Sequence, residues 1–106
     1  MKFLVITDDS KMPQDVGPVM VQSMERWTAE RKKTRNIEAI YSLAGNHGAI
    51  LIIDVDSPEG LDELIISMPA CVCSDFQIYP LADFGTAMKN LKQHYKKVMG
   101  LIKSAQ

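Results

Sequence analysis

Residues 44–69, AGNHGAILIIDVDSPEGLDELIISMP, constrain the fold of this chain more than any other stretch. The stretch contains a turn flanked by glycines, an apolar strand at 49–55 and an amphipathic helix that Pro69 ends. A strand that is apolar on both faces needs a covering layer on each side. The helix that follows can cover only one side. A second layer must therefore cover the other.

The helix start within this stretch has a well-defined signal. Ser57 is a good N-cap, Pro58 fits the first helical position, and Glu59 faces the positive end of the helix dipole. The apolar residues then recur at helical spacing and predict the buried stripe Leu61, Leu64, Ile65 and Met68.

The remaining elements follow from periodicity and turn residues. Residues 2–7 predict a strand, and residues 8–17 a loop. A helix begins at Pro18, with the stripe Met20, Met24, Trp27 and Arg31. Residues 37–44 alternate with the period of a strand, and Gly45 to Gly48 predicts a hairpin turn before the strand at 49–55.

The last two elements are a strand at 72–81 and a helix that Asp83 caps. The strand is expected to place Val72, Phe76 and Ile78 on one face and Cys73, Asp75, Gln77 and Tyr79 on the other. In the helix, apolar residues recur at steps of three or four, at Phe84, Met88, Leu91, Tyr95, Val98 and Ile102.

The order β-α-β-β-α-β with an added C-terminal helix predicts an α+β, ferredoxin-like fold in a single domain, residues 1–106. In this fold the helices cover one face of the antiparallel sheet. The other face carries apolar residues here, so we expect the sheet of a second subunit against it, in a homodimer.

Composition narrows the function classes. The formal net charge is −1, which favours neither a nucleic-acid nor a membrane-surface protein. The longest uninterrupted apolar run, residues 49–53, is too short for a membrane span, and the N-terminus lacks a signal-peptide pattern. Cys71 and Cys73 are too few and too close for a disulfide framework, so we expect a cytoplasmic protein.

Residues 44–81 resemble the muconolactone δ-isomerase-like branch of the dimeric α+β barrel superfamily. The match lies in AG at 44–45, IIDVDS at 52–57, DELI at 62–65, MP at 68–69 and DFQIYPL at 75–81. The resemblance implies a sheet-to-sheet dimer, which can assemble further, and a small pocket between the sheet and its helices. It also implies an apolar, aromatic or lactone-like ligand and no metal or organic cofactor.

The resemblance further implies a type of chemistry. Relatives isomerise muconolactone in aromatic catabolism, and other barrel members oxidise or cyclise polyketides. Small proteins of this type also accompany pigment pathways such as that of prodigiosin.

Three residues are candidates for catalysis. Moving a lactone double bond requires a group that removes and returns a proton next to a carbonyl. His47 fits because an imidazole titrates near neutrality, although a histidine in a hairpin turn is more often simply exposed. Asp75 lies in a polar patch of its strand, and Glu30 is the acidic group of the first helix in register with the resembling family.

The candidates for substrate binding are Tyr41, Tyr79, Arg26 and Trp27. The tyrosines could line a pocket or an interface, and Arg26 could hold a carboxylate. The alternatives are local packing for the tyrosines, a solvated helix face for Arg26 and a place in the core for Trp27.

Other functions of this fold lack their motifs. An RNA-recognition module exposes aromatic residues on its first and third strands, where this chain offers only Phe3. A metal chaperone would carry C-x-x-C in its first loop, which has no cysteine, and no metal site is predicted.

Two hypotheses remain open. The first is a cofactor-independent isomerase or cyclase that acts on a small apolar metabolite in catabolism or secondary metabolism. The second is a non-catalytic relative that binds such a compound or assists a partner enzyme.

Overall fold

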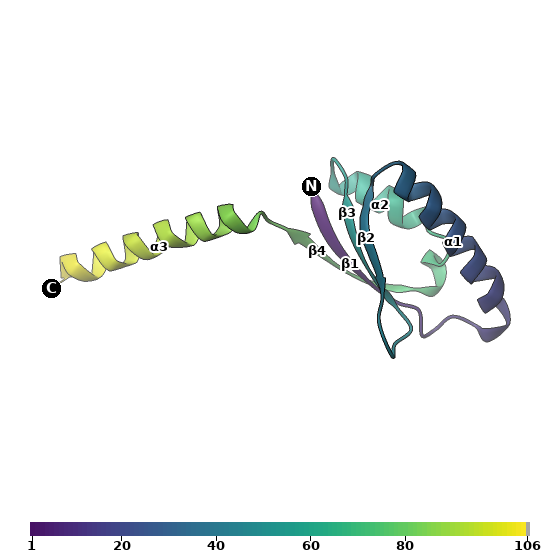
Figure 1. Ribbon diagram of the computed structural model, residues 1–106. Coiled ribbons are helices and arrows are strands. Elements are labelled where there is room, and N and C mark those ends of the chain that lie inside the picture. Colours follow the sequence, from purple (N-terminus) through teal and green to yellow (C-terminus); the bar gives the residue numbers. More distant parts are fainter. Residues whose placement is uncertain (106) are drawn as a thin grey trace.

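The computed structural model describes residues 1–105, and its elements follow the predicted order (Figure 1). The strands are β1 (Lys2–Asp8), β2 (Ile37–Ser42), β3 (Ala49–Asp54) and β4 (Asp75–Leu81). The helices are α1 (Gly17–Lys33), α2 (Pro58–Ile66) and α3 (Phe84–Ala105). The strands form one antiparallel sheet in the order β2-β3-β1-β4, which is the ferredoxin-like arrangement.

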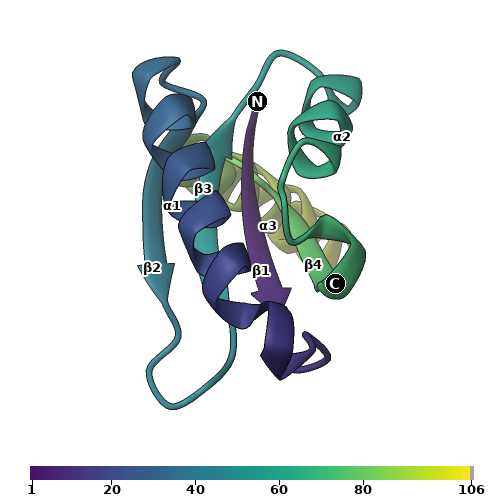
Figure 2. The same cartoon turned by 90° about the vertical axis from the view of Figure 1, so that its right-hand side faces the viewer.

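Both α1 and α2 lie on the same face of the sheet (Figure 2). That face holds the core, in which the side chains of Val5, Leu51 and Ile53 are almost completely buried. The predicted stripe of α2 is confirmed, because Leu61, Leu64, Ile65 and Met68 are all buried. Ser57 caps α2 as predicted, since its side chain accepts a hydrogen bond of 3.1 Å from the Gly60 N–H.

The opposite face of the sheet, which we call the open face, carries no helix (Figures 1 and 2). Because side chains alternate along a strand, the neighbours of the buried residues of β1 and β3 point to this face. These neighbours are Leu4, Ile6, Ile50 and Ile52, and all four are half-buried. The prediction of an apolar bare face is therefore confirmed.

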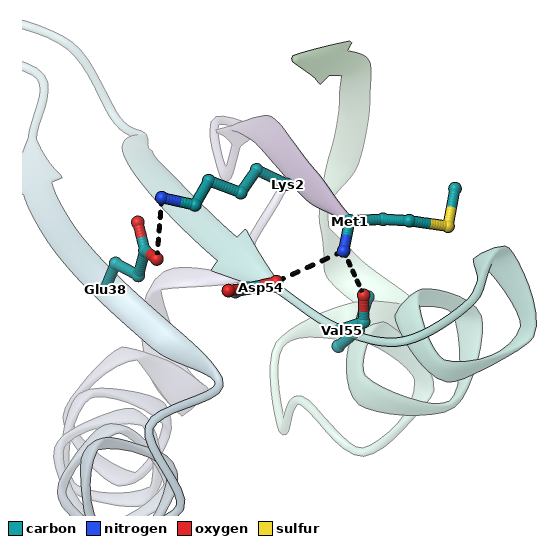
Figure 3. Close-up of polar contacts among 5 residues, drawn as sticks. All are labelled: Met1, Lys2, Glu38, Asp54 and Val55. Atoms are coloured by element: carbon teal, nitrogen blue, oxygen red, sulfur yellow. Dashed lines mark hydrogen bonds and ion pairs between the residues drawn. The ribbon is translucent and has the colours of Figure 1, made fainter. Parts of the chain in front are cut away.

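Polar contacts hold the start of the chain against the sheet (Figure 3). The amino group of Met1 donates to the Val55 carbonyl oxygen at 2.7 Å and pairs with the Asp54 carboxylate at 3.2 Å. The Lys2 ammonium lies 3.1 Å from the Glu38 carboxylate of β2. These side chains are about half exposed, so such pairs contribute little to stability and mainly keep the strand ends aligned.

The predicted strand at 72–81 was wrong at its start. Cys71–Cys73 form a short 3-10 helix, in which the Cys73 N–H donates to the Ala70 carbonyl oxygen at 3.0 Å, and β4 begins at Asp75. Cys73 therefore does not share a strand face with Asp75. Val72 is 90% exposed instead of packing beside Phe76. After Pro69 ends the helical pattern, the chain passes through consecutive tight turns, and it enters the sheet only at Asp75.

Two further boundaries also differ. β2 ends at Ser42 and not at residue 44, and a bulge between Ile37 and Ala39 interrupts its alternation. β3 ends at Asp54, one residue before the predicted end. The bulge shifts which side chains of β2 face the helices, so that Ile40 packs against the core.

Gly48 allows the β2–β3 hairpin to approach β1 closely. A Cβ atom at this position would overlap the Thr7 carbonyl oxygen, while the Thr7 hydroxyl accepts a hydrogen bond of 3.0 Å from the Ala49 N–H. We therefore expect Gly48→Ala to lower the free energy of unfolding by about 1–3 kcal/mol, measured by urea denaturation. Gly17→Ala is the control, because a Cβ atom there meets nothing within 4 Å. Equal stability of the two variants would contradict this account of the hairpin.

Candidate functional site

A large cavity lies along α1, between this helix and the sheet, and we call it the α1 pocket. Its volume is about 1020 Å³. The loop before α1 and the β2–β3 hairpin complete its walls. The apolar residues that line it are Met12, Pro13, Met20, Val21, Met24, Ala29, Ile40, Ala49 and Ala70.

The pocket exists because, among the described residues of α1, only Trp27 is buried in the core, and the cavity lies beside much of the rest of the helix. Trp27 is the buried residue of this helix, and Met20 and Met24 are only half-buried. Under the N-terminal half of α1, the sheet presents the small side chains of Ser42 and Ala49, which leave space. The predicted stripe of α1 is therefore core at Trp27 and pocket wall at the two methionines.

His47 lies at the rim of the α1 pocket, in the hairpin turn. The turn is fixed at several points, since the His47 carbonyl oxygen accepts from the Asp9 N–H at 2.6 Å, and the Leu43 N–H donates to the Gly48 carbonyl oxygen at 2.9 Å. The His47 side chain is exposed. This arrangement fixes the backbone of His47 beside an apolar cavity and leaves the imidazole open to solvent.

Three charged side chains share the rim of the α1 pocket with His47: Asp9, Glu25 and Lys32. Asp9 is half-buried, and its carboxylate accepts a hydrogen bond from the Ser74 hydroxyl. An ammonium group at the rim of a pocket attracts the carboxylate of a ligand. The rim therefore offers an acid–base group, two carboxylates and one cation.

A second cavity, of about 650 Å³, lies at the same end of the sheet and also includes His47. Asp8 and Asp75 line it, and the Lys11 ammonium lies 3.1 Å from the Asp75 carboxylate. The Ser10 backbone N–H, which donates to Asp8 at 3.0 Å, is the main cause that lowers the pKa of Asp8. Lys11 and His47 lower this pKa further, so Asp8 adds a negative charge near the imidazole.

The structure thus brings together two of the three predicted catalytic residues, His47 and Asp75, at the second cavity. Glu30 and Arg26 are exposed on α1 and line neither of these two cavities. Asp75 lines the second cavity but not the α1 pocket.

The predicted aromatic binding residues lie elsewhere. Trp27 is 5% exposed, and its indole N–H donates to the Ser67 hydroxyl at 2.9 Å, which ties α1 to the end of α2. Tyr79 is paired with Leu4 and Tyr41 with Ile50, so both tyrosines lie on the open face. They are 50% and 66% exposed there, which places them where a second subunit's sheet is expected.

The sequence interpretation missed Asp9, Glu25 and Met12 as pocket residues. Glu25 lies outside the predicted stripe of α1, but it directly follows Met24 and so borders the methionine row. Asp9 and Met12 belong to a loop whose course periodicity does not describe. The Asp9–His47 backbone hydrogen bond holds this loop close to the hairpin. Because the bond joins segments far apart in sequence, local patterns do not reveal it.

Among residues 1–105, no helix is both long and apolar enough to cross a bilayer. Within the same range, no three His, Cys, Asp or Glu side chains gather in a way that could hold a metal ion.

Comparisons with known proteins agree with this fold. The model of the muconolactone delta-isomerase family matches residues 1–87. Among solved structures, the crystal structure of muconolactone isomerase is similar at a TM-score of 0.63 and 22% identity, over 78% of this chain and 90% of that chain. A search of curated proteins finds no match. Because the family match covers β1 to β4 and reaches the start of α3, this chain belongs to the muconolactone delta-isomerase family.

Proposed function

We propose that this protein is a cofactor-independent isomerase or cyclase that acts on a small apolar metabolite, aromatic or lactone-like. The observation that carries the proposal is the position of His47 at the rim of the α1 pocket. A largely apolar cavity with a few converging polar groups is the usual form of a small-molecule site. Family membership supports a reaction in which a proton moves next to a carbonyl.

The α1 pocket can supply each part of such a proton transfer. The apolar body of the substrate would lie against Met20 and Met24, with its carboxylate toward Lys32. The His47 imidazole would remove the proton next to the carbonyl and return it to another carbon, so no net proton is gained or lost. Asp9 or Glu25 would stabilise the imidazolium between the two steps.

The same proposal includes a biological setting. We place the reaction in aromatic catabolism or in secondary-metabolite biosynthesis, such as that of a prodigiosin-type pigment, in the cytoplasm. We also propose a homodimer through the open face, because Leu4, Ile6, Ile50 and Ile52 form an apolar surface there that a second sheet would bury. The dimer can assemble into a higher oligomer.

Hydrogen–deuterium exchange of candidate substrates tests the chemistry. Muconolactone and related lactones are incubated with the protein in D₂O, and loss of the C–H signal next to the carbonyl is followed by NMR. This readout detects proton transfer even when the isomerisation equilibrium is unfavourable. Exchange faster than in buffer is the expected result, and the absence of exchange with every lactone that binds would contradict an isomerase.

The alternative is a binding or accessory protein that performs no chemistry. The exposure of His47 and the pairing of Asp75 with Lys11 favour it, because neither group is held against the apolar wall. This alternative predicts that lactones or phenolic acids raise the melting temperature without any exchange of carbon-bound hydrogen.

A further inference from the structure

Helix α3 has a continuous apolar stripe, and none of its described residues is buried. Figure 1 shows it projecting from the end of β4, away from the rest of the molecule. With α3 included, the longest dimension of the chain is 69 Å. Tyr95 is 63% exposed and Leu91 44%, near the middle of the helix. Most helical stability in proteins comes from packing an amphipathic face, so this stripe needs a partner surface.

The spacing of the stripe indicates that the partner surface is itself a helix. The apolar positions alternate steps of four and three over the whole helix, which is the 3.5-residue period of helices that pack along each other. These positions are Phe84, Met88, Leu91, Tyr95, Val98 and Ile102.

The charge of α3 indicates the character of that partner. The helix contains five lysines and no acidic residue. Four of them, Lys89, Lys92, Lys96 and Lys103, follow one another at steps of three, four and seven residues, so they form one row along one side of the stripe. A surface with apolar residues beside a row of carboxylates would complement this face.

The outer face of α2, on the same chain, supplies such carboxylates together with one exposed apolar side chain, Ile66. Residues 54–68 contain five acidic residues and no basic one. Glu59, Asp62, Glu63 and Ile66 follow one another at helical spacing on its exposed side, and Ile66 is 65% exposed. None of these three carboxylates belongs to the ion pairs found within residues 1–105. Val72, which is 90% exposed, adds a second apolar side chain just after the helix.

We propose that α3 of each copy docks on the outer face of α2 of a second copy, so that two chains exchange their C-terminal helices. In the arrangement observed, α3 points away from its own α2, which leaves the second copy as the source of the matching face. Antiparallel pairing of two α3 helices would bring their lysine rows together. An anionic membrane would attract α3 but repel the rest of the chain. That remainder carries seven basic residues against 13 acidic ones.

The proposal goes beyond the proposed activity and does not depend on it. It also differs from the dimer through the open face, since it assigns a role to a helix that lies almost wholly outside the family match, which ends at residue 87. Both contacts could occur in one assembly, so the test must separate them.

Charge exchange between the two helices tests the docking in the full chain. One variant carries Lys89→Glu, Lys92→Glu and Lys96→Glu, and the other carries Glu59→Lys, Asp62→Lys and Glu63→Lys. Self-association is measured by sedimentation velocity at low ionic strength, with circular dichroism to establish that both variants are folded. Each variant alone is expected to raise the dissociation constant by at least about tenfold. An equimolar mixture should restore the wild-type value, because the two altered faces then meet.

Lys97→Glu is the matched control, because Lys97 lies outside the row formed by the other lysines, and it should leave the dissociation constant unchanged. Wild-type association of the α2 variant would contradict the proposal, as would a mixture that stays dissociated. Ile52→Lys on the open face separates the two contacts. If it alone weakens association, the open-face dimer stands and the docking of α3 is overturned; if only the charge variants do so, the docking stands and the open-face dimer fails.

Discussion

Replacing Ile53 with alanine is expected to lower the free energy of unfolding by about 2–5 kcal/mol, which is the cost of truncating a large residue in a closely packed core. Ile53 lies in the middle of β3, opposite Phe3 on one side and Ile37 on the other, and is 0% exposed. Its side chain faces the layer formed by α1 and α2, so solvent cannot enter the cavity that the truncation would create. Urea denaturation followed by circular dichroism measures the change.

Ile52→Ala is the matched control, because it removes the same atoms from the adjacent residue of the same strand. Ile52 is half-buried and points to the open face. Its effect should depend on protein concentration if a second copy covers that face, whereas the effect of Ile53→Ala should not. Equal, concentration-independent losses for both variants would show that the assignment of the two sheet faces is wrong.

Replacing His47 with glutamine is expected to slow lactone hydrogen exchange by about 10²–10⁴-fold, the usual contribution of a positioned acid–base group. Glutamine keeps much of the size and the hydrogen-bonding capacity of the imidazole but cannot take up a proton at neutral pH. The backbone contacts of the turn, including the Asp9–His47 hydrogen bond, do not involve the side chain and should persist. Ligand affinity should therefore change little while the exchange rate falls.

His94→Gln provides the control for this substitution. His94 is the other histidine of the chain, is exposed on α3 and contacts the ring of Tyr95 at a centroid distance of 5.9 Å. It should leave exchange unchanged. A His47→Gln protein that retains the wild-type exchange rate would remove His47 from the mechanism, and equal losses of affinity and rate would make it a binding residue only.

The fold could be predicted because its signals are local and agree with one another. Ser57, Pro58 and the four-residue stripe of α2 define a helix without reference to the rest of the chain, and the alternation and turn residues around Gly48 define the hairpin. The error at Cys71–Cys73 has a different cause. β-branched and apolar residues there fit a strand by composition, but their conformation depends on how the chain leaves α2.

The candidate site could be predicted only in part, because three separate segments assemble it. His47 was identifiable from its residue type and its place in a turn. Asp9 and Glu25 were not, because their relation to His47 depends on how α1 and the preceding loop lie over the sheet. The stripe of α1 had the same ambiguity, since helical spacing does not distinguish a methionine in the core from one that lines a cavity.

The methyl groups of the seven methionines allow the most direct test of the α1 pocket as the ligand site. Met12, Met20 and Met24 line it, whereas Met68 lies in the core and Met88 and Met99 lie on α3. With methyl-¹³C-methionine in the full chain, titration with lactones and phenolic acids should shift the signals of Met12, Met20 and Met24 and leave those of the other methionines in place. Shifts confined to methionines outside the pocket, or no shift with any of these compounds, would contradict the account.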